Sequence, residues 1–273
     1  HDFACDIPDF ANKLMAQCWP GPLTLILPRR EGIGLATAGG QNSIGVRCPS
    51  HPVALALLKA ARGLGVLGVA GPSANRFGRV SPTTAQHVAS EFDPSLLILD
   101  GGPCPVGIES SIVDCTRRVP VLLRPGMLSQ AQLSLACGQA VLTQAEYEGS
   151  NAVGSAPRAS GMLASHYAPK ASLRLLTSLA MCEARPAPER PVGIWARSPV
   201  PQPPHGAMIR SMPNDPQLCA RALFAQLREF EALGVAEIWV EALPLSAEWD
   251  GIRDRLARAA VPAEAKVGTS SLN

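Results

Sequence analysis

The sequence has no long apolar run, no clustered cysteines and no excess of either charge. Its 273 residues include 24 Lys and Arg against 22 Asp and Glu, and a net charge of +2 provides no broad cationic surface for non-specific nucleic-acid binding. Pro, Gly, Arg or Asp interrupts every apolar stretch before the roughly 18 to 20 residues that a membrane-spanning helix needs. With 47% hydrophobic residues, the composition predicts a globular, cytoplasmic protein that does not contact a membrane.

The eight cysteines contain no C-x-x-C pair and no Cys/His cluster with zinc spacing. Free cysteine behaves as a small buried hydrophobe, so we expect scattered core thiols in a reducing compartment and no metal site from them. The signatures of P-loop NTPases, α/β-hydrolases and zinc proteases are also missing. Gly63–Gly68 has the dinucleotide-binding G-x-G-x-x-G spelling, but it follows a predicted helix and enters a predicted strand, which is the wrong context.

The first part of the chain alternates short apolar runs with turn residues, which predicts an α/β or α+β fold with a twisted, partly antiparallel sheet. We expect strands at 23–27, 43–47, 65–71, 96–99, 111–113 and 119–123, and helices at 52–61, 83–92 and 129–137. A loose Gly/Ser/Ala/Pro stretch at 148–160 indicates a linker.

Beyond the linker, the pattern becomes regular and predicts a smaller, Rossmann-like α/β domain with a parallel sheet. The expected strands are 173–176, 192–196 and 237–242, and the expected helices are 215–233 and 247–260. In the longer helix, Asp215 is placed to cap the start and Gly234 to end it. The predicted boundaries are 1–138 for the first domain, 139–170 for a linker or lid, and 171–273 for the C-terminal domain.

Polar residues follow several of the apolar runs. They are Ser43, Arg47, Ser73, Asn75, Ser81, Ser110, Ser111, Arg124, His166 and Tyr167. Without a matched nucleophile and base, hydroxyls, amides and guanidinium groups indicate anion and small-molecule recognition more than covalent catalysis. Turns and helix caps are the alternative for each Ser and Asn, and a salt bridge is the alternative for Arg47 and Arg124.

At these same positions, the sequence resembles the two-domain threonylcarbamoyl-AMP synthases, whose catalytic domain is YrdC-like. Six motifs carry the resemblance, in the family's order: Trp19-Pro20-Gly21-Pro22-Leu23-Thr24, Gly45-Val46-Arg47-Cys48-Pro49, Pro72-Ser73-Ala74-Asn75 with Ser81-Pro82-Thr83, Glu109-Ser110-Ser111-Ile112-Val113-Asp114, Leu123-Arg124-Pro125-Gly126 and His166-Tyr167-Ala168-Pro169. They span residues 19–169, while the C-terminal segment agrees in length and pattern.

The resemblance implies a YrdC-like mixed sheet with helices and a nucleotidyltransferase that makes threonylcarbamoyl-AMP and pyrophosphate from L-threonine, bicarbonate and ATP. The product would supply downstream tRNA-modifying transferase proteins that form threonylcarbamoyladenosine in tRNA. Bound Mg²⁺ is expected with ATP. No protein nucleophile is expected, because catalysis would consist of positioning and charge neutralisation.

The site residues follow from the matching positions. The resemblance assigns His1, Arg47, Gly71 and Ser110 to threonine, with Arg47 facing the carboxylate. It assigns Ser43, Ser73, Ser81, Arg124 and Tyr167 to ATP, with Tyr167 on a lid over 155–167. It also implies that a Lys-x-Arg-Pro stretch and the first strands of the sheet should lie upstream of His1, so we expect an incomplete catalytic domain.

Two other functions stay open at this point. A binding module could contact tRNA or double-stranded RNA weakly through Arg76 and Arg79, without catalysis. A related carbamoyl transferase is the other, although such proteins carry cysteine pairs that this sequence does not have.

Overall fold

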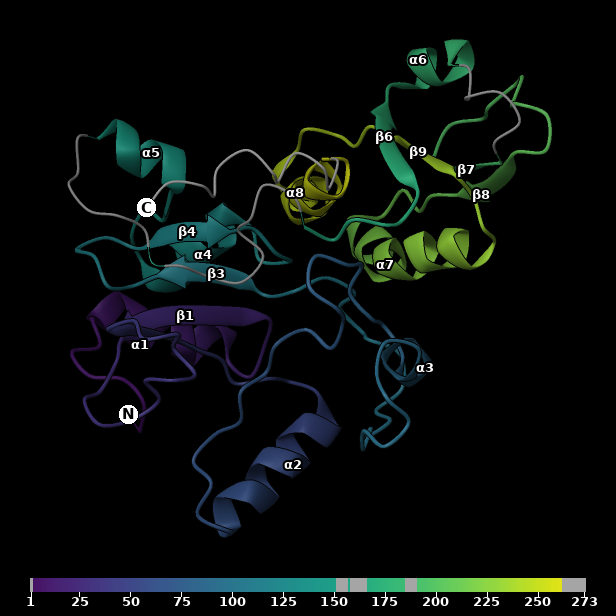
Figure 1. Ribbon diagram of the computed structural model, residues 1–273. Helices are drawn as coiled ribbons and strands as arrows, with labels where there is room; N and C mark the ends of the chain where they lie inside the picture. The colour runs from purple at the N-terminus through teal and green to yellow at the C-terminus, as the bar shows by residue number, and fades with distance from the viewer. Residues whose placement is uncertain (1, 151–156, 158–165, 185–190, 262–273) are drawn as a thin grey trace, which may run out of the picture. The chain divides into compact units, whose positions relative to one another are not determined.

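The computed structural model describes residues 2–150, 157, 166–184 and 191–261. Its contacts divide the chain into two compact units. The first comprises His1–Pro72 and Glu109–Met162, and the second comprises Ser73–Ile108 and Leu163–Asn273. We describe each unit by itself (Figure 1).

The first unit contains a five-stranded mixed sheet in the order β2-β1-β3-β4-β5. Its strands are β1 (Leu23–Pro28), β2 (Ser43–Val46), β3 (Ser111–Asp114), β4 (Val121–Arg124) and β5 (Leu142–Thr143). Strand β1 is antiparallel to β2 and parallel to β3, while β4 is antiparallel to β3 and parallel to β5. The predicted mixed sheet is therefore confirmed.

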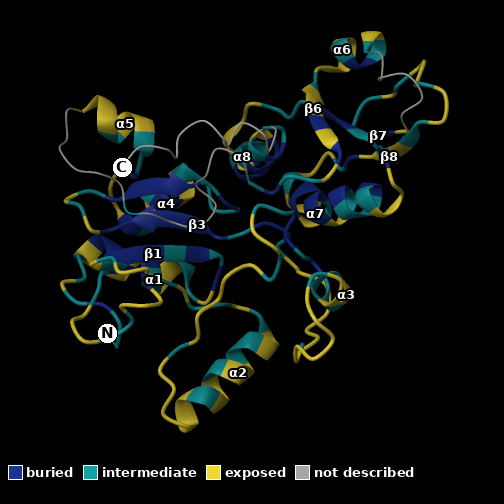
Figure 2. Ribbon diagram, viewed as in Figure 1, coloured by how far each residue is buried: buried dark blue, intermediate teal, exposed yellow. Residues whose placement is uncertain are grey.

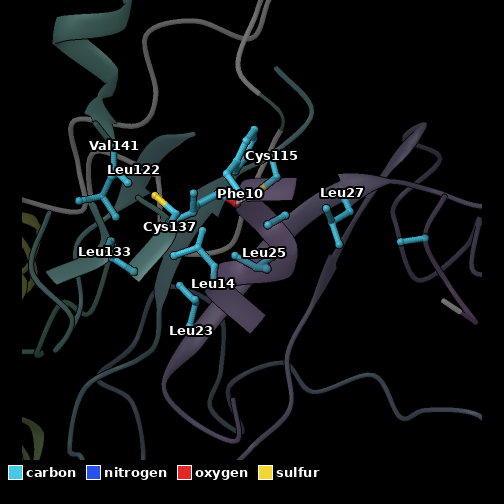
Figure 3. Packing of buried hydrophobic residues seen from close by; sticks show 13 residues of the cluster. Phe10, Leu14, Leu23, Leu25, Leu27, Cys115, Leu122, Leu133, Cys137 and Val141 are labelled. Atoms are coloured by element: carbon cyan, nitrogen blue, oxygen red, sulfur yellow. Dashed lines mark hydrogen bonds between the residues drawn. The ribbon is translucent and has the colours of Figure 1, made fainter. Parts of the chain in front are cut away.

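Alternation along β1 separates the two faces of this sheet. Leu23, Leu25 and Leu27 belong to the larger buried cluster, together with Phe10 and Leu14 from α1 (Asp9–Cys18) and Leu133 from α4 (Gln130–Cys137). Figure 3 shows these side chains gathered beside β1. A smaller cluster contains Ile26, Ile112, Val121 and Leu123 from the other set of strand positions.

The helices of this unit differ in how their ends are capped and in how much of each is buried. Helix α4 begins with a full capping box, in which Ser129 and Gln132 bond each other's backbone, and ends at Gly138 with φ +74°. Helix α5 (Gln144–Gly149) is also capped by a box, between Thr143 and Glu146. Helix α2 (Pro52–Gly63) forms as predicted but buries none of its residues (Figure 2).

The second unit contains a four-stranded parallel sheet in the order β6-β9-β7-β8. Its elements are α3 (Ala85–Ala89), β6 (Ser172–Leu176), α6 (Ser178–Glu183), β7 (Val192–Ala196), β8 (Met208–Ser211), α7 (Pro216–Ala232), β9 (Glu237–Glu241), η1 (Ala247–Trp249) and α8 (Asp250–Ala259). Strands β7 and β9 are almost fully buried, as central strands of a parallel sheet should be. The predicted parallel α/β arrangement is confirmed.

Helix α7 has the boundaries and caps that the sequence predicts. Asp215 accepts a hydrogen bond from the backbone N–H of Leu218 at 2.8 Å, and Gly234 has φ +71°. Leu223, Phe224, Leu227 and Phe230 of this helix are buried.

The compact units do not follow the order of the sequence. Residues 73–108 group with the C-terminal residues, although they precede β3 and β4 in the chain. A division by contacts and a division into domains need not coincide, and the predicted domain boundaries at 138 and 170 stay a prediction.

Two predicted strands are wrong. Residues 65–71 and 96–99 form no strand, and Val66, Leu67, Val69, Leu96 and Leu97 are exposed. An apolar run becomes a strand through its neighbours, and neither segment pairs with a strand among the described residues. The predicted helix at 83–92 is limited to α3, and the one at 247–260 begins as the 3-10 turn η1. Sequence patterns did not predict α1, α5, α6, β5 or β8.

We expect Leu25→Ala to lower the free energy of unfolding by about 2 to 5 kcal/mol, because it opens a cavity in the cluster between α1 and the sheet. Urea unfolding monitored by circular dichroism would measure this change. Leu245→Ala is the matched control: Leu245 is 89% exposed, so the expected change stays within about 0.5 kcal/mol. Equal effects of the two substitutions would contradict the assignment of the core.

Candidate functional site

A cluster of polar groups lies in the first unit, where β1 begins and β4 ends. The hydroxyls of Thr24 on β1 and Ser110 before β3 are 2.7 Å apart. Arg124 at the end of β4 donates from Nε and Nη2 to the carbonyl oxygen of Ser110, at 3.2 and 2.9 Å. Both Ser110 and Arg124 are buried. The guanidinium of Arg124 therefore fixes the backbone of Ser110, and with it the position of the Ser110 hydroxyl next to Thr24.

An irregularity in the sheet brings Arg124 to this position. Ile112 pairs with Arg124 and the next residue, Val113, pairs with Leu122, so β4 carries one extra residue. Such a bulge redirects the side chains that follow it. Close backbone packing adds to the constraint, because a Cβ on Gly126 would lie 2.4 Å from the backbone nitrogen of Ser111.

The turn before β1 closes the same end of the sheet. The indole N–H of Trp19 donates to the carbonyl of Leu23 at 2.7 Å, and the backbone N–H of Gly21 donates to the carbonyl of Cys48 at 2.9 Å. The second of these bonds ties the turn to the residues that follow β2. Arg47 immediately precedes Cys48, so its backbone is fixed by the turn that starts β1.

Arg47 is placed on the face of Thr24 by the strand register. Leu25 pairs with Val46, and both pack in the helix-covered cluster. Continuing the alternation by one residue puts Arg47 on the opposite face, beside Thr24. Arg47 is exposed, and the described part of the chain contains no hydrogen-bond or ion-pair partner for its guanidinium. It is a cation that is available to a ligand.

The other predicted residues of the first unit lie elsewhere. Ser43 pairs with Pro28 at the opposite end of β2, about 13 Å along the strand from Arg47. Gly71 lies in an exposed segment without regular structure. His1 lies outside the described residues, as does most of the predicted lid at 155–167. The structure therefore brings Ser110 and Arg124 into contact, and the strand register puts Arg47 on the face of Thr24. Neither Ser43 nor Gly71 joins them.

In the second unit, Ser73 and Ser81 stand at the two ends of one loop. Ser73 is exposed and Ser81 is buried. The amide nitrogen of Asn75 donates to the carbonyls of Arg76 and Arg79, at 2.8 and 3.2 Å, and so folds the loop on itself. The loop therefore has a defined shape, and for Asn75 the structure shows the turn that the sequence left as an alternative.

His87 supports the end of this loop. The backbone N–H of Thr83 donates to Nδ1 of His87 at 3.2 Å, so this nitrogen acts as an acceptor and carries no proton. Burial, together with the nearby guanidinium of Arg228, lowers the pKa of His87 below its usual value. The hydrogen bond and the charge environment both favour the neutral imidazole.

Tyr167 is a buried residue of the second unit, with φ +61°. Its ring centroid lies 5.4 Å from that of Phe224 on α7 and 4.1 Å from that of His166. The guanidinium of Arg255 on α8 lies 5.5 Å from its ring centroid. In this arrangement, Tyr167 is packed as a core residue, and its predicted contact with ATP stays a prediction.

Sequence reasoning did not assign Thr24 or His87 to the candidate site. Thr24 was visible as a hydroxyl inside an otherwise apolar strand, which is an unusual choice for a fully buried run. His87 gave no signal, because a histidine in a short helix has many structural uses.

Among the described residues, the structure shows no metal-binding cluster, no disulfide and no helix that could span a membrane. No group of three or more His, Cys, Asp or Glu side chains with metal-binding geometry occurs in the described ranges. All eight cysteines are free, and Cys115, Cys137 and Cys219 are buried. None of the helices in the described part of the chain has the length and hydropathy needed to cross a bilayer.

Two family models match the chain. The Sua5/YciO/YrdC model, described as telomere recombination, matches residues 1–126. The model of the threonylcarbamoyl-AMP synthase C-terminal domain matches residues 128–261. Together, these models cover both compact units.

Curated relatives carry the name threonylcarbamoyl-AMP synthase. The protein of Pyrococcus abyssi is 40% identical over 62% of this chain and 48% of its own length, and that of Bacillus subtilis is 37% identical over 68% and 50%. The protein of Schizosaccharomyces pombe is 31% identical over 95% of this chain and 68% of its own. The chain thus spans about half the length of the first two relatives.

The fold also matches a solved structure. The crystal structure of Pyrococcus abyssi Sua5 complexed with L-threonine has a TM-score of 0.80 and 30% sequence identity, and the match covers 95% of this chain and 76% of that one. A second Pyrococcus abyssi structure, a variant with His and Tyr replaced by Ala, has a TM-score of 0.79.

The neutral state of His87 leads to a prediction about pH. Because the folded pKa of His87 is lowered, the unfolded chain binds more protons as the pH falls below about 6.5, and stability should fall with it. His87→Gln should remove part of this loss of stability, as measured by the melting temperature above and below that pH. His205→Gln, at an exposed position, should keep the pH dependence of the unchanged protein. Identical pH profiles for the unchanged protein and His87→Gln would contradict the assignment.

Proposed function

The chain belongs to the threonylcarbamoyl-AMP synthase family, and from this premise we propose that it binds L-threonine and forms threonylcarbamoyl-AMP from L-threonine, bicarbonate and ATP. The observation that carries the proposal is the Thr24–Ser110 hydroxyl pair. The exposed Arg47 follows β2, and continuing the strand register by one residue puts it on the same face of the sheet as Thr24. An amino acid needs a cation for its carboxylate and polar groups for its remaining atoms. This end of the first sheet offers both.

Arg47 is the residue that we assign to the threonine carboxylate. Its planar guanidinium can donate two parallel hydrogen bonds to a carboxylate. Thr24 and Ser110 each carry a hydroxyl that can donate or accept, so the pair can adapt to the amine or the side-chain hydroxyl of threonine. Arg124 acts differently, because it holds the carbonyl of Ser110 and keeps that hydroxyl in place.

The proposed reaction has two steps. The threonine amine attacks bicarbonate, and loss of water gives an N-carboxylate. An oxygen of this carbamate then attacks the α-phosphorus of ATP, the bond between that phosphorus and the bridging oxygen to the β-phosphate breaks, and pyrophosphate leaves. The role of the protein is to hold the labile carbamate in line and to offset negative charge, and no side chain needs to form a covalent bond.

The nucleotide side rests on the family resemblance. Of the residues that the resemblance assigns to ATP, Ser73, Ser81 and Tyr167 lie in the second unit. Ser43 and Arg124 lie in the first, where Arg124 already holds the carbonyl of Ser110. Mg²⁺ would enter with ATP, because this ion is usually bound by substrate phosphates with few protein ligands. We therefore treat the metal as part of the substrate.

The RNA-binding alternative loses support from the loop contacts. Arg79 pairs with Glu231 at 2.8 Å, and Arg76 donates from its backbone and side chain to Glu91 at 3.4 Å. Both arginines that could contact RNA thus have intramolecular partners. The carbamoyl-transferase alternative gains no supporting observation from the cysteines, because no two of them form the C-x-x-C pair that such proteins carry.

Arg47→Ala should abolish binding of L-threonine, because the carboxylate would lose its cation. Titration calorimetry should show a decrease in affinity of about a hundredfold or more, and Arg47→Lys should restore a part of it. In a full-length enzyme, threonine-dependent release of pyrophosphate should disappear in parallel. Arg62→Ala is the control, since Arg62 forms an exposed ion pair with Asp2 and lies outside the cluster. Undiminished threonine affinity in Arg47→Ala would rule out the assignment.

Removal of divalent cations with EDTA should separate the two substrates. Threonine binding to the chain should persist, because Arg47 and the hydroxyl pair need no metal. Pyrophosphate release from ATP should stop and should return on addition of Mg²⁺. Loss of threonine binding in EDTA would contradict the view that the metal belongs to ATP.

A further inference from the structure

One face of helix α7 contacts the loop that carries Ser73 and Ser81. Phe224, Arg228 and Glu231 follow one another at spacings of four and three residues, so they lie on the same side of the helix. Their partners are distant in the chain: Phe224 contacts Tyr167, Arg228 contacts Ser81, and Glu231 contacts Arg79. All of the residues involved belong to the second unit.

Arg228 makes the central contacts. Its Nε donates to the carbonyl of Ser81 at 3.1 Å, and its Nη2 donates to the carbonyl of Val80 at 2.5 Å and to a carboxylate oxygen of Glu91 at 2.8 Å. The side chains of Arg228 and Glu91 are 10% and 11% exposed. A guanidinium that is this far removed from water depends on these acceptors, and the two carbonyls depend on it in turn.

Glu91 and Glu231 extend these contacts along the loop. Glu91 also accepts from the backbone N–H of Arg76, and hydrogen bonds from Arg228 and Arg76 overcome the effect of burial and lower the pKa of its carboxyl group. Glu231 accepts from Arg79 at 2.8 Å and from the backbone N–H of Lys170 at 2.7 Å. The carboxylates of Glu91 and Glu231 therefore hold the loop at Arg76 and at Arg79.

The same helix holds the surrounding segments. Phe224 packs against Tyr167, and the backbone of Ala168 donates to the carbonyl of Gly78 at 2.9 Å. At the far end of the segment, a Cβ on Gly107 would lie 2.2 Å from the carbonyl oxygen of Ala220, so the backbone of residue 107 touches α7 directly. Gly107 has φ +87°, which a glycine adopts without strain.

We propose that Arg228 is a positioning residue, which holds the backbone of Val80 and Ser81 in the conformation that binds the nucleotide. The inference rests on the proposed function and deepens it, because it gives the C-terminal helix α7 a role in the affinity for ATP. A loop that is already ordered loses less conformational entropy when the ligand binds. Loss of the hydrogen bonds from Arg228 to the carbonyls of Val80 and Ser81 should therefore weaken nucleotide binding, although every side chain of the loop itself is unchanged.

The test compares Arg228→Ala, Arg228→Lys and the unchanged chain. Lysine keeps the charge but cannot reproduce the fork that reaches two carbonyls and a carboxylate, so it should rescue the effect in part. Arg210→Ala is the matched control, because Arg210 pairs with Glu229 of the same helix but is 41% exposed and does not contact the loop. Titration calorimetry measures the affinity for a non-hydrolysable ATP analogue and for L-threonine, and hydrogen exchange follows the amides of residues 74–83.

In Arg228→Ala, we expect the affinity for the ATP analogue to fall by about tenfold or more, whereas the affinity for L-threonine should change by less than about twofold. Amide exchange should accelerate in residues 74–83 and stay unchanged in β1 and β3. Arg210→Ala should match the unchanged chain in both affinities.

The outcomes distinguish the inference from the proposed function. If the unchanged chain binds the analogue and Arg228→Ala binds it equally well, the positioning role is wrong and the proposed function stands. If both affinities fall to the same extent, Arg228 is a general stability residue and the inference is also wrong. If the unchanged chain binds neither ligand, the proposed function itself is wrong.

Discussion

The register of β1 against its neighbours is the constraint on which the polar cluster of the first unit depends. Alternation places Leu23, Leu25 and Leu27 in the helix-covered core, and thereby turns Thr24 toward the other face. A slip by one residue would exchange the two sets and bury the hydroxyl in the main core, at the cost of an unsatisfied polar group. The same apolar residues that stabilise the fold therefore also set the position of Thr24 beside Ser110.

The second unit fixes its loop by charge rather than by strand pairing. Residues 73–81 contain no strand, and an isolated bridge between Arg79 and Ala168 satisfies the carbonyl of Gly78 but not those of Val80 and Ser81. Arg228 supplies donors for two of these carbonyls, and Glu91 neutralises the charge that burial would otherwise penalise. This arrangement explains why residues 73–108 group with the C-terminal residues, which no local pattern in the sequence could indicate.

The sequence predicted those features that depend on neighbouring residues. The strand β1, the parallel sheet of the second unit and the caps of α7 all followed from local periodicity and capping residues. It failed where the outcome depends on distant partners: the runs at 65–71 and 96–99 have the composition of strands, but none of the described residues forms a strand beside them. For the site, it selected Arg47, Ser110 and Arg124 as residues next to strand ends, and their roles stay a prediction. It could not show that Ser43 lies at the opposite end of β2.

The contacts of the arginines separate two roles that the sequence pattern could not distinguish. Arg124 and Arg228 both donate through Nε and Nη2 to backbone carbonyls next to a serine hydroxyl, namely those of Ser110 and of Val80 and Ser81. Each is largely buried, so it is committed to the conformation of the protein. Arg47 also follows a strand, but it is exposed and has no partner in the described part of the chain. A guanidinium that already has its acceptors cannot give them up without a loss of stability, whereas Arg47 can bind a carboxylate at no such cost. Ligand binding by this chain should therefore depend on Arg47 directly, and on the two buried arginines through the backbone that they hold.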